Sequence, residues 1–277
     1  MFSKLTNEAF LKFTLHNEGP LLINSGQSAK IQPRPDMSFV RTVRNGEETV
    51  YLPGSSIKGV FRSRYEQVMR AIGQEVCDTF DYKGNQTCKK KIEEEIWQKK
   101  TMLNGKERYI RCCEACKLFG TLALGSRITF FDAYPIGKYK MGMRHGVGID
   151  RITGAAHPGA LYDIETLDDG EFFVKCKITN FKIYQLRIIL WILEDINEGL
   201  VTFGMGGSRG NGQMRISNNS EVELTYLKYS DDAPIIDGQS NDALFGTMTK
   251  ISGFSEMLTK FNINTKDELT NAIIKGW

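Results

Sequence analysis

The chain has 277 residues, of which 41% are hydrophobic and 25% are charged, and its formal net charge is only +3. These are ordinary values for a globular protein with one large domain or two small ones, and they exclude a strongly basic chain. No run of about eighteen apolar residues occurs and the first residues lack the apolar core of a secretory signal, so we expect a cytoplasmic protein without a membrane span.

The N-terminal part of the chain predicts one strand and one long helix. Residues 8–16 alternate polar and apolar side chains, as strands do, whereas residues 17–52 contain several prolines and are expected to be irregular. A helix is expected to begin with Ser55 as its N-cap and to stop at Gly73. Its apolar stripe consists of Ile57, Val60, Phe61, Val68, Met69 and Ile72.

Residues 74–118 form an insertion that is rich in cysteine and lysine, with a short polar helix expected in its middle. Because cytoplasmic thiols stay reduced, grouped cysteines indicate a metal site rather than disulfides. The pair Cys113-x2-Cys116 has the spacing of a zinc knuckle, and Cys77 and Cys88 complete a set of four thiolates. Such a set leaves no open position for water, so the zinc is expected to be structural.

Two alternatives for these cysteines stay open. Cys112 can replace Cys113 as a ligand, and the four thiols can also be free groups in a flexible insertion. The insertion has few apolar residues, so a metal would supply the stability that its core cannot, which favours zinc. Cys176 lies in a predicted strand and is expected to be a buried apolar residue.

The second half of the chain predicts further strands and helices. Strands are expected at 126–133, at 171–181 and from Gln213 onward. Helices are expected at 185–199, which is apolar nearly all round and therefore buried, and near 266–274. A segment rich in glycine and charge at 135–165 and a glycine-rich loop at 203–212 lie between them.

The order of these elements is strand, helix, strand, strand, helix, strand. This order predicts an α+β fold of the ferredoxin-like (RRM-like) βαββαβ type, with an antiparallel sheet and both helices on one face. The open face of such a sheet commonly binds RNA.

Four segments carry a resemblance that extends this prediction: LPGSSIKGVFRSRYE at 52–66, CKLFG at 116–120, GIDRITGAAHPGALYDIE at 148–165 and GGSRGNGQM at 206–214. In this order they resemble the RAMP superfamily of CRISPR-associated proteins. The third is similar to the thumb hairpin of the backbone subunits in Csm-type and Cmr-type complexes, and the fourth to the glycine-rich loop of the superfamily. The resemblance implies a single RAMP domain over residues 1–277, with a thumb at about 135–165. The cysteine-rich insertion at about 74–118, which we expect to bind zinc, and a C-terminal extension at about 218–277 make the chain longer than the plain Csm-type subunit.

The resemblance implies a guide-RNA-binding backbone subunit of a type III CRISPR effector complex, which serves antiviral defence. Its partners would be the guide RNA, a target single-stranded RNA, and other effector subunits, including copies of itself or related RAMP subunits. The residues implied in RNA binding are Ser55, Ser56, Lys58 and Arg62 in the first helix, Arg144, Ile149, Arg151 and Ile152 in the thumb, and Gly206, Gly207, Ser208, Arg209 and Gly210 in the loop.

The residue types in these three segments suit contacts with RNA. Glycine lets a backbone approach a phosphate closely, and Arg209 can bind a phosphate with two hydrogen bonds. Lys58 and Arg62 lie four residues apart and so adjacent on one face of the helix, although a solvated helix face is the alternative. In the family the thumb pushes between bases, and Ile149 and Ile152 are the candidates for this wedge.

The resemblance also implies a single catalytic aspartate in the loop before the Pro-Gly-Ser-Ser turn, and Asp36 in QPRPDMSF occupies that place. Its carboxylate would hold Mg²⁺ or another divalent metal, while the 2′-hydroxyl of the substrate attacks the phosphate. From the residues alone, a turn-forming aspartate in a surface loop is the alternative. If Asp36 only forms a turn, the protein is a purely structural RNA-binding subunit. A second alternative is a stand-alone endoribonuclease of the same superfamily, which processes guide RNA and usually has a catalytic histidine.

A histidine pair can serve as acid and base in RNA cleavage. His145 and His157 both lie in the predicted thumb, but nothing in the sequence brings them together. We expect each of them to contact RNA or to face solvent.

Overall fold

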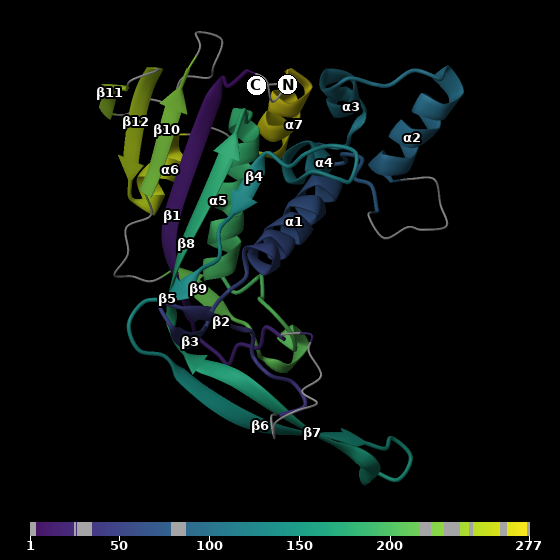
Figure 1. Ribbon diagram of the computed structural model, residues 1–277, viewed down its shortest axis with the longest axis vertical. Helices are drawn as coiled ribbons and strands as arrows, with labels where there is room; N and C mark the ends of the chain where they lie inside the picture. Colours follow the sequence, from purple (N-terminus) through teal and green to yellow (C-terminus); the bar gives the residue numbers. More distant parts are fainter. Residues whose placement is uncertain are drawn as a thin grey trace.

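The computed structural model describes residues 4–24, 26, 35–78, 87–216, 223–229, 239–243, 246–260 and 265–275. It shows an α+β fold with antiparallel sheets, which confirms the predicted α+β class (Figure 1). In the described part of the chain, the central sheet has eight strands, with the order β11, β12, β10, β1, β8, β4 and with β5 beside β8 and β9 beside β1. No helix among the described residues is both long and apolar enough to cross a membrane.

The sheet is built around β1 (Asn7–Asn17) and β8 (Glu171–Thr179), which pair along nearly their whole length. Ala9, Leu11 and Phe13 in β1 are buried, as the alternation in this segment predicts. The other strands are β4 (Ile128–Phe130), β5 (Tyr134–Pro135), β9 (Met214–Ile216), β10 (Glu223–Lys228), β11 (Gln239–Ala243) and β12 (Gly246–Ser252). The strand predicted at 126–133 is thus shorter than expected, because only three residues pair continuously with β8.

Two long helices cover one face of this sheet (Figure 1). Helix α1 (Gly54–Ala71) lies between β1 and β4 in the chain, and α5 (Ile183–Asn197) joins β8 to β9. The buried face of α1 includes Ile57, Phe61 and Met69, which lie at multiples of four residues from one another. Nearly all of α5 is buried, as its apolar sequence predicts. This arrangement is compatible with a ferredoxin-like fold.

The start of α1 differs from the prediction. Pro53, and not Ser55, is the N-cap residue, and no side chain of the helix caps the first turn. Instead, the N–H of Gly54 donates a hydrogen bond to Asp132 Oδ1 at 2.8 Å, from the segment that follows β4. A Cβ on Gly54 would lie 2.3 Å from the carbonyl oxygen of Phe130, so this close approach requires glycine.

The region 17–52 also contains regular structure, although its prolines predicted an irregular segment. A hairpin of β2 (Arg41–Arg44) and β3 (Glu47–Val50) turns at Asn45–Gly46, both with positive φ, 53° and 86°. Asn-Gly is the preferred pair for such a turn, so the signal was present in the sequence and the expectation of irregular structure was wrong there.

Two appendages extend from the core. The insertion contains the expected polar helix α2 (Cys88–Lys99), followed by α3 (Gly105–Arg111) and α4 (Glu114–Phe119). The segment resembling a thumb is a hairpin of β6 (Lys140–Ile149) and β7 (Ala156–Asp169), which projects away from the central sheet (Figure 1).

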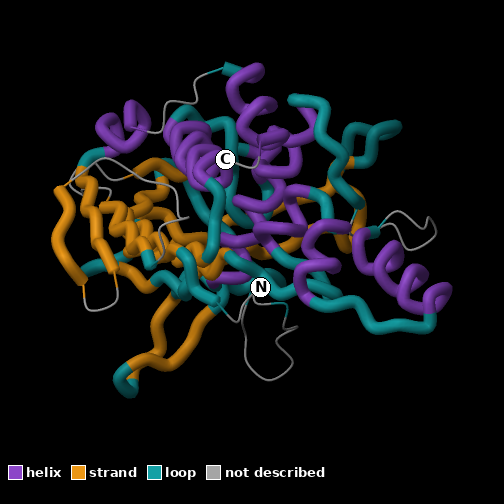
Figure 2. Tube along the Cα trace, turned by 90° about the horizontal axis from the view of Figure 1, so that it is seen from above, coloured by secondary structure: helices purple, strands orange, loops and turns teal. Residues whose placement is uncertain are grey.

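The tail adds the strands β10 to β12 to the sheet and also contains two helices, α6 (Phe254–Lys260) and α7 (Lys266–Lys275). Helix α7 confirms the short helix predicted near 266–274. Figure 2 shows the helices gathered on one side of the strands.

Candidate metal centre and nucleic-acid interface

Four cysteine side chains converge where the insertion meets the core. The sulfur atoms of Cys77, Cys88, Cys113 and Cys116 all lie within 4.8 Å of one another. The Sγ atom of Cys77 is 3.4 Å from that of Cys116 and 3.8 Å from that of Cys113. A tetrahedral zinc ion with Zn–S bonds of about 2.3 Å separates its sulfur ligands by about 3.8 Å, so the group fits a structural zinc site. It contains Cys113 rather than Cys112.

The surroundings of the four sulfurs favour negative charge. The N–H of Cys113 donates a hydrogen bond to Cys88 Sγ at 3.2 Å, and Arg62 Nη2 lies 3.6 Å from Cys116 Sγ. Without a metal, hydrogen bonding to Cys113 raises the pKa of the Cys77 and Cys116 thiols, while that to Cys116 lowers the pKa of Cys113. Four thiols so close together cannot all ionise unless a cation compensates their charge, and a zinc ion held by these cysteines would supply that charge.

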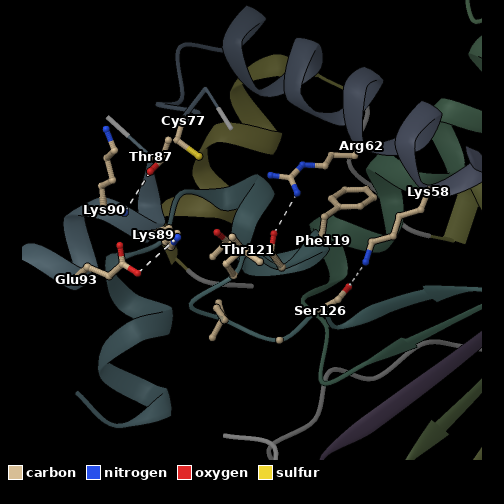
Figure 3. Close-up of a pocket in the computed structure, with 14 residues that line it drawn as sticks. Lys58, Arg62, Cys77, Thr87, Lys89, Lys90, Glu93, Phe119, Thr121 and Ser126 are labelled. Atoms are coloured by element: carbon tan, nitrogen blue, oxygen red, sulfur yellow. Dashed lines mark hydrogen bonds and ion pairs between the residues drawn. The ribbon is translucent and has the colours of Figure 1, made fainter. Parts of the chain in front are cut away.

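A pocket of about 610 Å³ lies beside this cluster, between α1, the start of α2 and the loop at 120–126 (Figure 3). Four basic side chains line it: Lys58, Arg62, Lys89 and Lys90. Lys58 Nζ donates to Ser126 Oγ at 2.8 Å, and among the described residues no carboxylate forms an ion pair with it. Burial, and next the charge of Arg62, lower the pKa of Lys58. A bound anion would relieve both effects.

The two cations of α1 therefore differ in their surroundings. Arg62 Nε donates to Glu66 at 2.8 Å, and its Nη1 donates to the carbonyl oxygen of Gly120 at 3.1 Å. Arg62 thus links α1 to the cysteine cluster, and both cations are half-buried rather than fully solvated. Ser55 is exposed and Ser56 is half-buried at the same helix start.

The glycine-rich loop is held firmly in place. The N–H of Met205 donates to the carbonyl oxygen of Leu22, and that of Gly212 to Pro20. Gly212 has a φ of +80°, and a Cβ on it would lie 2.0 Å from the carbonyl oxygen of Phe203. A short 3-10 turn spans Gly207–Arg209 between the left-handed residues Gly206 and Gly210. The loop is therefore a defined element of the fold and not only a linker.

The loop and the thumb meet at one hydrogen bond. Arg209 Nη1 donates to the hydroxyl oxygen of Tyr162 on β7 at 3.0 Å. The tip of the thumb lies far along the hairpin from this contact, where Asp150 accepts hydrogen bonds from the N–H groups of Ile152 and Thr153. The two residues predicted as a wedge are at the surface, with Ile152 96% exposed and Ile149 63% exposed. Arg144 and Arg151 are exposed on the same hairpin.

Asp36 lies against the middle of the thumb hairpin. Its Oδ2 accepts a hydrogen bond from the N–H of Asp163 at 2.9 Å, and its side chain is exposed. The N–H of Met37 donates to the carbonyl oxygen of Asp163 at 3.1 Å, so the segment runs alongside β7. The neighbouring residues 31–34 lie outside the described part of the chain.

The open face of the sheet carries aromatic and basic side chains that the sequence reasoning did not single out. Phe131 and Phe173 are exposed by 42% and 46%. Lys175 Nζ lies 5.6 Å from the ring centroid of Phe131 and 5.9 Å from that of Phe10. Strand alternation placed Phe173 and Lys175 opposite the buried positions, which is the signal that could have identified them.

The predicted residues thus form two groups. In the first group, Asp36 and Arg209 contact the middle of the thumb hairpin at residues 162–163 of β7. The pocket gathers Lys58 and Arg62 beside the cysteines, with Lys89 and Lys90 as additions from α2.

A family model described as the RAMP superfamily matches residues 14–215 of the chain. No curated protein matches it. The matched region contains Asp36, α1, the four clustered cysteines, the thumb and the glycine-rich loop.

Proposed function

Because the chain belongs to the RAMP superfamily, we propose that it is a guide-RNA-binding backbone subunit of a type III CRISPR effector complex and that it cleaves the target RNA paired to the guide. The observation that carries the proposal is the meeting of Asp36, the glycine-rich loop and the thumb at residues 162–163 of β7. Its partners are the guide RNA, the target RNA and other effector subunits.

Guide binding rests on two phosphate sites. One is the pocket of Lys58, where a half-buried ammonium group without a carboxylate partner among the described residues lies near a second cation. The other is the glycine-rich loop, where Gly206, Gly210 and Arg209 present backbone and a guanidinium group. An RNA phosphate bound at either site would supply the negative charge that these cations lack. Contacts of this kind position RNA without reading its sequence.

The architecture that we propose is a single domain with a ferredoxin-like βαββαβ core formed by β1, α1, β4, β8, α5 and β9. The insertion at about 74–118 holds a structural zinc ion, the thumb at about 135–165 inserts between bases, and the residues beyond about 218 form an extension. Lys89 and Lys90 line the Lys58 pocket, which makes the insertion part of the RNA surface.

Cleavage rests on Asp36. Among the described residues, the carboxylates near Asp36 do not form a cluster of three or more metal-ligating groups. The site fits Mg²⁺ only as one carboxylate shared with RNA phosphates, which is a common way for proteins to bind this ion. A bound divalent metal would stabilise the charge that develops on the scissile phosphate. The protein itself positions the target strand against the middle of the thumb hairpin.

One observation favours a second candidate function, a structural subunit that binds RNA without cutting it. Asp36 already has a local role, because its Oδ2 accepts the N–H of Asp163 and so helps to attach its own segment to β7. Cleavage of complementary RNA by the guide-bound protein, with and without Mg²⁺, separates the two candidates. A protein that binds guide and target but never cuts supports the structural subunit.

We expect the Lys58→Ala and Arg209→Ala variants each to weaken guide binding equally for guides of different sequence. Each lost phosphate contact should also reduce the slope of log affinity against log salt by about one unit. Affinity measured by filter binding or fluorescence anisotropy at several salt concentrations checks this. Lys106→Ala is the matched control, because Lys106 is exposed on α3 and does not line the pocket. Unchanged affinity and slope in both variants would remove these residues from the RNA interface.

A further inference from the structure

The thumb strand β7 brings Asp36 next to a histidine–aspartate pair. Asp163 donates its backbone N–H to Asp36 Oδ2 at 2.9 Å, and its Oδ1 lies 2.6 Å from His145 Nδ1. His145 and Asp163 are direct partners in the register of β6 and β7. Asp163 therefore contacts both the predicted catalytic carboxylate and an imidazole.

The backbone of Asp163 explains why its side chain reaches His145. Its carbonyl oxygen accepts from Met37 and its N–H donates to Asp36, so both groups point away from β6. The pair of Asp163 and His145 is therefore of the non-hydrogen-bonded kind, in which facing side chains approach most closely.

The Asp36 segment is anchored on the same face of β7. Glu165 lies two residues after Asp163, so the two side chains project from one face. Arg41 donates to both carboxylate oxygens of Glu165, at 2.7 Å and 2.5 Å, and the N–H of Phe39 donates to the same side chain at 3.0 Å. This ion pair is largely buried, with exposed fractions of 21% for Arg41 and 15% for Glu165. The position of Asp36 relative to Asp163 and His145 is therefore set before RNA binds.

The carboxylate of Asp163 also decides which nitrogen of His145 is available. A carboxylate without a proton only accepts hydrogen bonds, so in the neutral imidazole Nδ1 carries the proton and Nε2 has the lone pair. The side chain of His145 is 75% exposed, so an RNA strand can reach it. A carboxylate that holds imidazole in this tautomer is a recurring feature of enzymes in which histidine removes a proton from a hydroxyl group.

We propose that His145 is the general base of the cleavage reaction and that Asp163 is its positioning residue, an inference that rests on the proposed function. His145 Nε2 takes the proton of the 2′-hydroxyl at the scissile nucleotide, and O2′ forms a bond to phosphorus. The bond between phosphorus and O5′ breaks, and O5′ takes a proton from water. The products are a 2′,3′-cyclic phosphate and a 5′-hydroxyl.

The test uses the full-length chain loaded with a guide RNA and a labelled complementary target RNA, under single-turnover conditions. General-base catalysis typically contributes at least about a hundredfold, so His145→Ala should slow cleavage by about that factor without a change in target affinity. Because the site is exposed, added imidazole should restore part of the rate in His145→Ala. His145→Gln, which can still hydrogen-bond to Asp163, should be as slow as His145→Ala. Asp163→Asn should also be slow, because an amide does not hold the same tautomer.

His157→Ala is the matched control, because His157 is an exposed histidine of the same thumb whose Nδ1 faces the carbonyl oxygen of Pro158 and not a carboxylate. It should cleave at the rate of the unmodified protein. Cleavage by His145→Ala within about threefold of that rate would overturn the proposal, and so would a loss that imidazole does not restore. If the unmodified protein never cleaves, the proposed cleavage itself fails and the role of His145 fails with it.

Discussion

Replacing Asp36 by alanine should reduce target cleavage by about a thousandfold, which corresponds to roughly 4 kcal/mol of transition-state stabilisation. Guide and target should still bind, because the proposed phosphate contacts of the guide lie in the Lys58 pocket and the glycine-rich loop and not at Asp36. The segment should also stay in place, since the pair of Arg41 and Glu165 and the hydrogen bonds of Met37 remain. Single-turnover cleavage and target affinity, measured on the same preparation, separate these effects.

Two further variants identify what Asp36 contributes. Asp36→Asn keeps an oxygen that can accept the N–H of Asp163 but loses the negative charge. It should be as inactive as Asp36→Ala if the charge is required, and fully active if only the attachment to β7 matters. Asp169→Ala is the matched control, because it removes an exposed aspartate that lies in β7, and it should leave cleavage unchanged. Full activity in Asp36→Ala would show that this residue takes no part in catalysis. Undiminished cleavage in the presence of a chelator would show that no divalent metal is required.

Loss of the zinc ion should unfold the insertion and leave the main sheet folded. The insertion has its own small buried cluster, which consists largely of cysteines together with Ile92 and Leu103 and packs against Leu124. The sheet and its two long helices share a separate core, which also includes Ala115 and Leu118 of α4. Structural zinc contributes about 10–16 kcal/mol of apparent binding free energy in small zinc domains, far more than so small a cluster can supply. We expect one zinc per chain by elemental analysis.

Cys116→Ser should lose this zinc, and proteolysis and hydrogen exchange should then increase within residues 74–118 while β1 and β8 stay protected. Cys112→Ser is the matched control. Cys112 is buried beside Cys113 but lies outside the group of four sulfurs, so this variant should keep its zinc. A metal-free preparation with a protected insertion would contradict the prediction, and loss of zinc from Cys112→Ser would reopen the choice between the two neighbouring cysteines.

Local patterns predicted the elements whose burial follows the sequence directly. The alternation in residues 8–16 predicted β1, and the segment 185–199, which is apolar nearly all round, predicted α5. The Asn-Gly pair at 45–46 is an equally local signal for a turn. It was not used, because the prolines of this region predicted irregular structure. The hydrogen bond from the N–H of Gly54 at the start of α1 could not be predicted, because its acceptor Asp132 lies 78 residues away in the sequence.

The candidate sites divide in the same way. The spacing of Cys113 and Cys116 is enough to indicate a metal site, because ligands from one short segment must lie close together. Asp36 and the thumb became candidates only through a resemblance. Nothing local connects Asp36 with Asp163 and His145, since 127 residues separate the two aspartates.

The sequence by itself determined the α+β class, the presence of a cysteine cluster in the insertion and the positions of the main strands and helices, whereas the structure decided that Cys113 and not Cys112 belongs to the cluster. These features depend on hydrophobic periodicity and ligand spacing within short segments, which the order of residues expresses directly. Only the tertiary structure decided that Lys58 is half-buried beside Arg62 and that Asp36 lies against β7 near His145. Such contacts arise from packing and strand register between distant segments, so they become visible only when the chain is folded.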